Sequence, residues 1–568
     1  MLEEIGTQAF TREQKEYLEA FFAGIRARAT GFADVEPLPK HPEPLAEPLI
    51  FEERVKKELH PLDAYSQLVE NASGNKAPSK EDTFRFKWNG LFFLAPNKEA
   101  FMTRLRIPGG QLRTFQLREL ARISTELTSG YVQITTRANL QMRLIQPKDA
   151  PEVLRRIQNI GLHTRGSGGD NIRNLTANPT AGIDPNELID TLPLCHEMAQ
   201  LIINNREFYD LPRKFNIALD GGGAIGTVED TNDIGLKAVK VGKEVMFRVA
   251  LGGATGHKAF ARDLGVLVAV DELLKVTMAL VRVFIANGNR GDRKKARLKH
   301  LLDTWTLDQY LAETEKLLGY QLRRAPLDAN ASSDTTTTPP HSHVGVFPQK
   351  QKGLNYIGVQ IPVGEITPKQ MHRIAEIADL YGSGEVRLTV WQNLIIPDIP
   401  DAYVETVKKA LVKIGFHWKQ SHLRSGIIAC TGAAYCKYAQ AHTKQHANEL
   451  ANYLEKKLSL DQPINIHLTG CPHSCAQHYM GDIGLLGTKV KVSGESVEGY
   501  HVFVGGGFAE NQAVGRQVFT GIAFTELKGM LEKMIKGYLR HRHAGETFAA
   551  FTQRHDLNTL QGIFSNDE

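Results

Sequence analysis

The stretch Val132-Gln-Ile-Thr-Thr-Arg-Ala-Asn-Leu140 decides the fold, because it returns later in the chain as Val386-Arg-Leu-Thr-Val-Trp-Gln-Asn-Leu394. The match extends back without a gap to Ile-Pro-Gly-Gly at Ile107 in the first copy and to Ile-Pro-Val-Gly at Ile361 in the second. The offset between matching residues is constant, and identical residues recur in register, which chance rarely produces. The sequence therefore predicts a fused duplication, with two similar units joined in one chain.

In each copy the pattern predicts a strand, a turn at Pro and Gly, a helix and a returning strand. The first helix covers roughly residues 112–127, and the second copy repeats its apolar spacing with Met371, Ile374, Ile377 and Leu380. The returning strand of the first copy alternates, with these polar residues on one face: Gln133, Thr135, Arg137, Asn139, Gln141 and Arg143. That face meets either solvent or a large anionic ligand.

The composition is that of an ordinary globular protein, with 42% hydrophobic and 23% charged residues among 568. No run approaches the roughly 18 apolar residues of a membrane span, and the acidic beginning Met1–Phe10 is not typical of a signal or transit peptide. A net charge of +5 is too mild to indicate a nucleic-acid binder. Five cysteines in so long a chain fit a reducing compartment, so we expect a cytoplasmic protein.

Four of the five cysteines form two close pairs, Cys430 with Cys436 and Cys471 with Cys475. An iron–sulfur cluster needs four converging thiolates and loops that leave room for a bulky core. Zinc sites usually separate their cysteines by two to four residues, and the first pair here is separated by five. The spacing favours a cluster over zinc, with redox-regulated or merely buried thiols as further alternatives. Cys195 stands alone in a helical pattern and is expected to be a buried small hydrophobe.

Basic residues gather on strand-like or Gly-rich segments of the first half. Arg104 and Arg106 lie two apart on one strand, as do Lys214 and Asn216, while Arg173 lies in a Gly/Asn loop. A denser basic run contains Arg290, Arg293, Lys294, Lys295, Arg297 and Lys299. An isolated basic residue is usually a member of a surface ion pair. Several such segments in one half, beside a metal centre, favour a pocket for a polycarboxylate cofactor and a small anion.

At these residues the chain resembles the sirohaem-containing nitrite and sulfite reductases, and most closely the ferredoxin-dependent assimilatory nitrite reductases. The resemblance covers roughly residues 81–568. The motifs that carry it are RLRIPGG, TTRANLQ, IRNLTANP, LPRKFN, NRGDRKKARLK, VRLTVWQNL and TGCPHSC. The fused internal repeat of this family matches the duplication found above.

The resemblance implies an internally duplicated α+β fold with pseudo-two-fold symmetry, in which ferredoxin-like repeat units accompany mixed α/β catalytic domains. Residues 330–340 are rich in Ser, Thr and Pro and predict a linker between the two halves. The expected segments are an N-terminal arm (1–80), a first ferredoxin-like unit (81–160), a first catalytic half (161–325), a linker (326–352), a second ferredoxin-like unit (353–418) and a second catalytic half (419–568).

The resemblance also implies the cofactors and the site. A 4Fe–4S cluster is expected on Cys430, Cys436, Cys471 and Cys475, and Cys475 is expected to bridge to the sirohaem iron. The sirohaem carboxylates are expected to be held by Arg106, Arg137, Gln141, Arg293 and Arg297. The substrate is expected on the open face of the iron, held and supplied with protons by Arg104, Arg173, Lys214 and Asn216. The reaction implied is the six-electron reduction of nitrite to ammonia.

Two residues depart from common forms of this family. Sulfite-reducing relatives typically have a second lysine at the position of Asn216. Nitrite carries one negative charge and needs less positive charge than sulfite, so Asn216 favours nitrite. His473 stands where asparagine is common, and it either lies exposed on its loop or contacts the sirohaem.

The sequence shows no flavin or nicotinamide module, so the electrons must come from another protein. The family implies ferredoxin, with flavodoxin as the other candidate, and a monomeric enzyme. By charge alone, an acidic donor would fit the C-terminal basic residues Lys528, Lys533, Lys536, Arg540 and Arg542. Two alternatives stay open: a ferredoxin-dependent sulfite reductase and, more distantly, a zinc-stabilised binding module without enzymatic activity.

Overall fold

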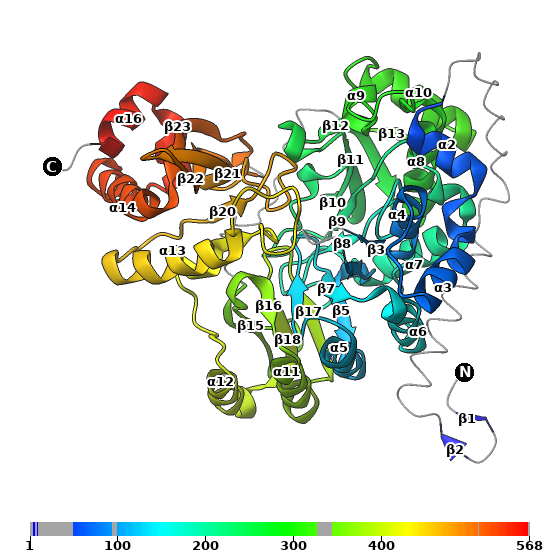
Figure 1. Ribbon diagram of the computed structural model, residues 1–568, viewed down its shortest axis with the longest axis horizontal. Coiled ribbons are helices and arrows are strands. Elements are labelled where there is room, and N and C mark those ends of the chain that lie inside the picture. The colour runs from blue at the N-terminus through cyan, green and yellow to red at the C-terminus, as the bar shows by residue number, and fades with distance from the viewer. Residues whose placement is uncertain are drawn as a thin grey trace.

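The computed structural model describes residues 49–93, 99–325, 343–508 and 511–565, together with two short strands, β1 (Glu4–Ile5) and β2 (Gln8–Ala9). The Pro-rich stretch 37–44 and the predicted linker residues 330–340 lie outside the described residues. In Figure 1 two sheets with their helices lie side by side in the upper part of the molecule, and two smaller helix-covered sheets lie below them. Among the described residues we find no helix that is both long and apolar enough to cross a membrane.

The two smaller sheets are the predicted repeat units. The first unit contains β3 (Leu91–Phe92), β4 (Phe101–Arg104), α5 (Thr114–Leu127), β6 (Val132–Ile134), β7 (Leu140–Ile145) and α6 (Ala150–Asn159). The second contains β14 (Gly345–Pro348), β15 (Leu354–Val359), α11 (Pro368–Tyr381), β17 (Glu385–Leu388), β18 (Leu394–Pro400) and α12 (Val404–Lys413). Helices α5 and α11 pack against each other, and each buries its predicted apolar face apart from Leu380, which is 63% exposed.

The two units exchange one strand each. Strand β5 (Gln111–Arg113) belongs to the first copy but pairs with β17 in the sheet of the second, and β16 (Glu365–Ile366) belongs to the second copy but pairs with β6 in the sheet of the first. Matching side chains fasten both exchanged strands: Gln111 donates to Glu385 over 2.8 Å, and Gln133 donates to Glu365 over 2.8 Å. The duplicated units are therefore interlocked about a pseudo-two-fold axis.

The returning strand of each copy is a hairpin, so the predicted single strand is wrong. Strands β6 and β7 pair antiparallel, and the turn between them is closed by the Thr135 N–H, which donates to the Asn139 carbonyl over 2.8 Å. Ala138 adopts a φ of 46° inside this turn, and Gln392 adopts a φ of 59° in the matching turn of the second copy. The alternation of polar and apolar residues continues from β6 through the turn into β7. The sequence pattern therefore resembled that of one long strand.

The two larger sheets repeat one topology. The first contains β8 (Thr176–Ala177), β9 (Ile217–Asp220), β10 (Ile234–Val241), β11 (Glu244–Leu251), β12 (Arg262–Ala269) and β13 (Arg323–Arg324). The second contains β19 (Ile427–Ala429), β20 (Ile466–Thr469), β21 (Ile483–Val492), β22 (Glu495–Val504) and β23 (Arg516–Ala523). In both, the first three strands are parallel neighbours and the following strands are antiparallel. The duplication thus extends through the catalytic halves.

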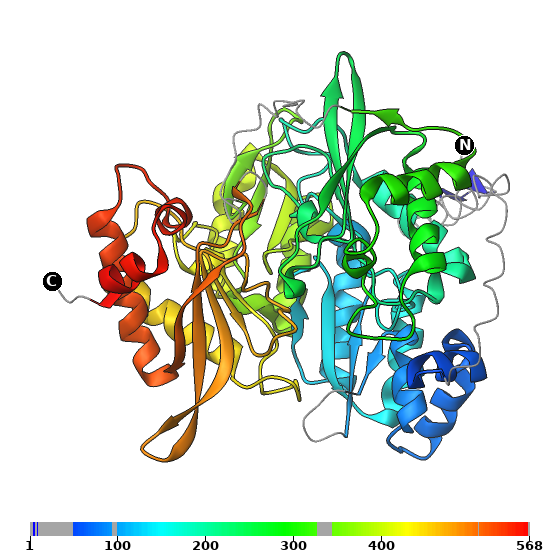
Figure 2. The same cartoon turned by 90° about the horizontal axis from the view of Figure 1, so that it is seen from above.

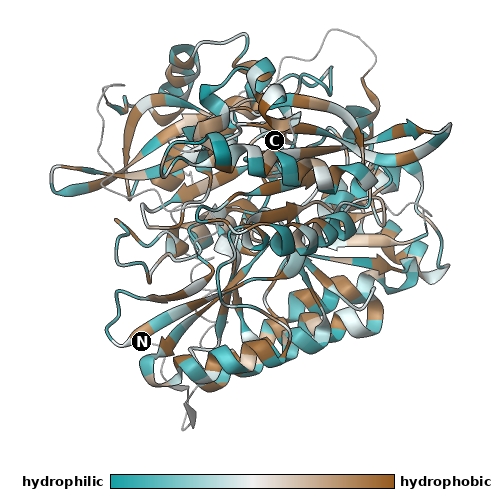
Figure 3. Cartoon of the chain, turned by 90° about the vertical axis from the view of Figure 1, so that its left-hand side faces the viewer, coloured by the Kyte–Doolittle hydropathy of each residue, from teal (hydrophilic) through white to brown (hydrophobic). Residues whose placement is uncertain are grey.

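Helices cover each larger sheet. The first half has α7 (Leu192–Asn204), α8 (Leu273–Asn287), α9 (Leu298–Leu301) and α10 (Leu307–Leu318), and the second has α13 (Thr443–Lys457), α14 (Phe524–His541), α15 (Phe548–Arg554) and α16 (Leu557–Ser565). Helix α8 is apolar almost all round and is buried along most of its length, whereas α13 and α14 bury one face. In Figure 3 the helices alternate between hydrophilic and hydrophobic residues along their length.

From residue 49 onward the predicted N-terminal arm is mainly helical. It contains α2 (Phe51–Glu58) and α3 (Tyr65–Ser73), followed by α4 (Lys80–Arg85). Figure 2 shows these blue helices at the opposite end of the molecule from the red C-terminal helices. Trp88, just after α4, is fully buried, and its indole N–H donates to the Tyr209 carbonyl over 2.7 Å. At the other predicted boundary, the linker 326–352 extends too far, because β14 already pairs with β15.

Candidate functional site

The four clustered cysteines are positioned by two neighbouring parallel strands. Cys430 directly follows β19, and Cys471 follows β20 after one glycine. Parallel strands end at the same edge of a sheet, so the topology brings these two residues together. The backbone N–H of Gly470 donates to the Cys430 sulfur over 3.2 Å, which confirms that the two loops touch.

The four thiols lie close together, because the charges of the other three cysteines act on Cys471. Burial raises the pKa of Cys471 to about 12, with a further increase from the charges of the other three cysteines. Burial also raises the pKa of Cys475, while Lys214 and Arg104 lower it. All four cysteines are free, and no group of His, Cys, Asp or Glu in the described part of the chain is gathered tightly enough for a single metal ion.

This spacing suits a cluster better than zinc. A single zinc ion draws its four ligands to about 2.3 Å from one point, whereas a 4Fe–4S core offers four separate iron corners to four cysteines. Cys475 is exposed, and Lys214 and Arg104 of the first half lie near it, so its thiol is open to a further ligand. The residues therefore fit both a cluster and a second, larger group beside Cys475.

A turn of the first half holds the loop of Cys475. The Thr136 hydroxyl, in the turn between β6 and β7, donates to the Cys475 carbonyl over 3.0 Å. Within the loop, Ser474 and Gln477 adopt φ angles of 52° and 56°, which direct the chain sharply around Cys475. The duplicated turn and the cysteine loop thus form one structure contributed by both halves.

Near Cys475 lies a group of cations, here called the cation cluster, which consists of Arg104, Arg137, Arg173 and Lys214. Burial lowers the pKa of Arg104 and Arg173, and lowers that of Arg137 to about 10. Arg173 is influenced by Arg104 and Arg137, and Arg137 by Arg104, so these three predicted residues are brought together. The cations outnumber the carboxylates among them, so the site favours an anionic ligand.

Lys214 is the most open cation of this cluster. Its side chain is exposed and makes no hydrogen bond or ion pair with the rest of the described chain. Although the side chain reaches solvent, the protein around its ammonium removes part of the hydrating water. This desolvation, together with the charge of Arg297, lowers the pKa of Lys214 to about 7, and the Cys475 thiol opposes this. Asn216 lies two residues further on; its backbone N–H donates to Asp233 over 2.9 Å, and its side-chain amide has no hydrogen bond.

Two residues predicted to hold carboxylates lie on the hairpin beside this cluster, Arg137 in its turn and Gln141 on β7. Arg137 donates to the side-chain oxygen of Asn232 over 2.9 Å, next to a cavity of about 10 Å³ that Thr136 and Asn232 also line. Gln141 faces Arg104 across the paired strands β4 and β7, and its side-chain oxygen accepts from Arg143 over 2.7 Å.

The structure does not bring Arg106 to the site. Its side chain is 2% exposed, and its guanidinium donates to the carbonyls of Arg165 (3.1 Å), Arg173 (3.1 Å) and Ile172 (2.7 Å). Regular pairing of β4 ends at Arg104, so the two arginines do not share one strand face as predicted. Arg106 instead holds the loop that carries Arg173.

Arg293 and Arg297 are already paired with buried carboxylates. Arg293 grips Asp170 with two hydrogen bonds of 2.6 and 2.9 Å, and Arg297 contacts Asp233 over 2.8 Å and 3.3 Å. Asp170 and Asp233 are 1% and 0% exposed. We predicted that these arginines hold carboxylates of the cofactor. Their guanidinium groups are instead largely occupied by Asp170 and Asp233, so they fix the loops around the site.

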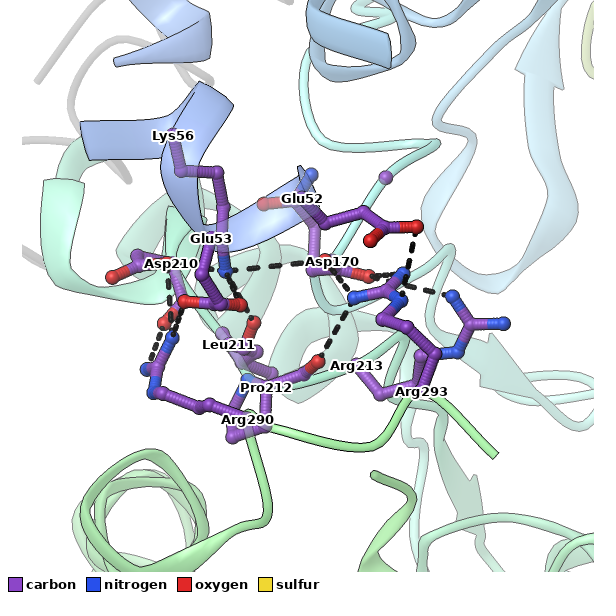
Figure 4. A network of polar contacts seen from close by, with 12 residues as sticks. Glu52, Glu53, Lys56, Asp170, Asp210, Leu211, Pro212, Arg213, Arg290 and Arg293 are labelled. Carbon is purple, nitrogen blue, oxygen red and sulfur yellow. Dashed lines mark hydrogen bonds and ion pairs between the residues drawn. The ribbon is translucent and has the colours of Figure 1, made fainter. Parts of the chain in front are cut away.

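Helix α2 reaches into this frame, which the sequence did not reveal (Figure 4). Lys56 forms ion pairs with Glu53 over 2.6 Å and with Asp210 over 2.8 Å, and Arg290 pairs with Glu53 over 3.1 Å. Lys56 also donates to the carbonyl of Leu211, three residues before Lys214. The N-terminal helix therefore fastens the segment that presents Lys214.

Sequence reasoning missed several residues of the site. Arg143 shares the alternating pattern of Arg137 and Gln141 and could have been found from it. Arg213 directly precedes Lys214, lies 3.9 Å from Asp170 and lowers the pKa of Lys214. Lys444 opens a helix far from the other basic residues in the sequence, and no pattern pointed to it.

His473 lies at the site although it is exposed. Its ring nitrogen Nδ1 lies 3.5 Å from the Cys471 sulfur, and burial together with the charges of Lys214 and Arg213 lowers its pKa. Its ring also packs edge-on against Tyr438 with a centroid distance of 5.2 Å. His473 is therefore exposed on its loop and lies near Lys214 and Arg213, and its contact with the sirohaem stays a prediction.

The predicted docking helix carries less free charge than its sequence suggests. Lys528 pairs with Glu449 over 2.7 Å, Lys536 with Glu532 over 2.6 Å, and Arg542 with Asp461 over 2.6 Å. A larger cavity of about 320 Å³ lies between α13 and α14, and none of its lining residues belongs to the cysteine or cation clusters. Docking at α14 stays a prediction.

Two family models match this chain. The model described as "Nitrite and sulphite reductase 4Fe-4S domain" matches residues 168–322 and 422–564. The model described as "Nitrite/Sulfite reductase ferredoxin-like half domain" matches residues 95–160 and 347–414. Each model therefore matches twice, once in each half of the duplication.

Similar proteins include nitrite and sulfite reductases. The chain is 38% identical to the ferredoxin–nitrite reductase of Synechococcus elongatus, over 85% of this chain and 95% of that protein. It is 32% identical to the ferredoxin sulfite reductase 1 of Mycolicibacterium paratuberculosis, over 91% of this chain and 96% of that protein. The solved structure of the Mycobacterium tuberculosis NirA protein is similar with a TM-score of 0.85 and 30% identity, over 90% of this chain and 98% of that chain.

Proposed function

The chain belongs to the nitrite and sulfite reductase family, and from this premise we propose that it reduces nitrite to ammonia in a six-electron reaction, with reduced ferredoxin as the electron donor. The observation that carries the proposal is the open cation cluster around the exposed Cys475 thiol. The ferredoxin–nitrite reductase that resembles the chain supports nitrite as the substrate and ferredoxin as the donor.

Residues of both halves would hold the cofactors. Cys430, Cys436, Cys471 and Cys475 would hold the 4Fe–4S cluster, with Cys475 shared with sirohaem, and Arg137 and Gln141 would hold sirohaem carboxylates. Sirohaem would supply an open iron site for nitrite, and the cluster would supply the electrons. Arg293 and Arg297 act through Asp170 and Asp233, whose ion pairs fix the loops around the site.

The chain's own part in the reaction is to hold the anion and to provide protons. Lys214 and Arg104 act on Cys475, and Arg173, which donates to the Ser167 and Gly169 carbonyls, lies near both of these cations. This positive charge favours a small anion and stabilises negative oxygen as N–O bonds break. A Lys214 pKa of about 7 suits an ammonium that gives up a proton readily near neutral pH. Asn216 offers an amide without adding charge.

The choice of nitrite over sulfite rests on Asn216. At this position a lysine would add a second cation beside Lys214, and a doubly charged anion would gain more from it than nitrite does. Asn216 is 7% exposed, and its side-chain amide has no hydrogen bond to the described residues, so it keeps its hydrogen-bonding capacity for a ligand. A monomeric state, a cytoplasmic location and flavodoxin as an alternative donor stay predictions.

An absorption spectrum of the protein purified without oxygen tests the proposal. We expect an intense Soret band and long-wavelength bands from sirohaem, which shift when nitrite is added. The variant Lys214→Met should keep the bands but need more nitrite for the same shift, because one cation is lost. A colourless protein with its full metal content, or bands that nitrite leaves unchanged, would reject the proposal.

A further inference from the structure

Lys444 is a buried cation beside the cysteine cluster. It is the second residue of α13, and its side chain is 8% exposed. Its ammonium donates to the Val363 carbonyl, and no carboxylate in the described part of the chain lies within ion-pair distance. Burial lowers the pKa of Lys444 to about 8, while the charges of Glu365 and the Cys430 thiol oppose that decrease.

Arg143 approaches the same cysteine from the first half. Its side chain is 5% exposed and donates to Gln133 over 2.9 Å and to the hydroxyl of Thr431, the residue after Cys430. Burial lowers the pKa of Arg143 to about 10, and the thiols of Cys436 and Cys430 oppose this. It has no carboxylate partner within ion-pair distance among the described residues, so each half places near Cys430 a cation that forms no ion pair there.

Buried cations without a partner destabilise a folded protein. They become favourable where an anion lies nearby, and an iron–sulfur core held by four thiolates is anionic. We infer that Lys444 and Arg143 are the counter-cations of the cluster and raise its reduction potential. The inference deepens the proposed function and rests on it, because it concerns the same cluster.

The step concerned is the uptake of one electron by the cluster from the reduced donor protein. No bond forms or breaks, and the cluster gains one negative charge. A fixed positive charge near Cys430 stabilises the reduced form more than the oxidised form, since the attraction grows with the charge of the cluster. Removing the cation should therefore make the cluster harder to reduce.

A purely structural role for Lys444 is the competing explanation. Val363 adopts a φ of 48°, which is unfavourable for a β-branched residue, and its counterpart in the first copy is Gly109 with a φ of 61°. The Lys444 ammonium donates to the Val363 carbonyl, so it could serve only to stabilise this strained turn. The test must therefore separate the charge of Lys444 from its hydrogen bond.

The cluster potential of the holoprotein can be measured by redox titration followed by electron paramagnetic resonance. Lys444→Gln keeps a hydrogen-bond donor for Val363 but removes the charge, and Lys444→Met removes both. Lys456→Met is the matched control, because it removes an exposed charge near the other end of the same helix. At the potential that reduces half of the wild-type clusters, we expect the reduced-to-oxidised ratio to fall about tenfold in both Lys444 variants and to stay unchanged in Lys456→Met.

Wild-type potentials in Lys444→Gln and Lys444→Met would overturn the inference. If both variants lose the cluster, Lys444→Arg decides: retention of the cluster at the wild-type potential supports the role of charge, and loss of the cluster contradicts it. Failure of the proposed function looks different, because the wild-type protein itself would then show no cluster signal and would not reduce nitrite.

Discussion

Asp233 and Asp482 occupy equivalent positions in the two halves, but only Asp233 has an arginine partner. Asp233 accepts from the backbone of Asn216 and pairs with Arg297 over 2.8 Å. Asp482 accepts from the backbone of Asn465 over 2.9 Å and from its side chain over 2.8 Å, without an ion pair in the described structure. The same fold therefore holds a paired aspartate at the site and an unpaired one in its pseudo-symmetric copy.

We expect Asp482→Asn to stabilise the protein at neutral pH. Burial raises the pKa of Asp482 from 3.8 to about 7. Between these values the folded state binds more protons than the unfolded state, so the stability contributed at this position falls as the pH rises from about 4 to about 7. Asparagine keeps the hydrogen bonds and removes this cost, which is on the order of 3 kcal/mol above pH 7. Urea unfolding of wild type and variant at pH 4, 6 and 8 measures it.

Asp233→Asn is the matched comparison, and its effect should have the opposite sign. It leaves Arg297, which is 6% exposed, without its anion, and breaking a buried pair costs about 3 kcal/mol or more. If both substitutions changed the free energy of unfolding equally at pH 8, the two aspartates would not differ in their ion pairing as described.

Substitution of Arg106 should affect stability, whereas substitution of Arg104 should affect substrate binding. Arg106→Ala leaves three buried carbonyls without their donor and should lower the free energy of unfolding by about 3 kcal/mol. Arg104→Ala breaks only a 3.4 Å contact to the Ser167 carbonyl and a packing contact with the Phe92 ring, so it should change unfolding little and raise the KM for nitrite about tenfold. Thermal unfolding and steady-state kinetics of both variants check this; a stable, fully active Arg106→Ala protein would contradict it.

The N-terminal helix should support the site from a distance. Lys56→Met removes the cation that joins Glu53, Asp210 and the Leu211 carbonyl, and should cost about 3 kcal/mol of stability. Its neighbour Lys57 is exposed, so Lys57→Met serves as the control and should leave the unfolding temperature unchanged. Identical unfolding temperatures for the two variants would show that α2 does not fasten the first half.

Asn216→Lys should move the preference of the enzyme toward sulfite. The new ammonium would lie beside Lys214 and attract a doubly charged anion more than nitrite, so we expect the ratio of kcat/KM for sulfite to that for nitrite to rise about tenfold. Asn216→Met introduces a side chain similar in length to lysine but without its charge, and it should not show this rise. An equal change in both variants would mean that size, and not charge, sets the preference.

Much of the fold could be predicted because the repeat is written in the sequence. The duplicated turn, the helices α5 and α11, and the equivalent strands β9 and β20 are all encoded locally by spacing and by matching residues. The cysteine quartet could also be predicted, because ligand residues at close spacing leave a signature. The strand exchange could not, since nothing local distinguishes a short strand that pairs within its own unit from one that pairs with the other.

The partners of the arginines could not be predicted from the sequence either. Arg104 and Arg106 look equivalent in a strand pattern, and only the end of β4 separates an open guanidinium from one that is bound to three carbonyls. Arg293 and Arg297 meet Asp170 and Asp233 through tertiary contacts over long sequence separations. Lys444 is positioned by the packing of α13 against the turn at Val363, and the sequence around Lys444 contains no pattern that indicates this contact.

The most direct test of the account is the product formed by the holoprotein with reduced ferredoxin and nitrite. We expect one ammonium for each nitrite consumed and six electrons taken from ferredoxin, with a kcat/KM for nitrite at least about tenfold above that for sulfite under the same conditions. Absence of ammonium from a protein that carries both cofactors, or sulfite reduction as efficient as nitrite reduction, would contradict it.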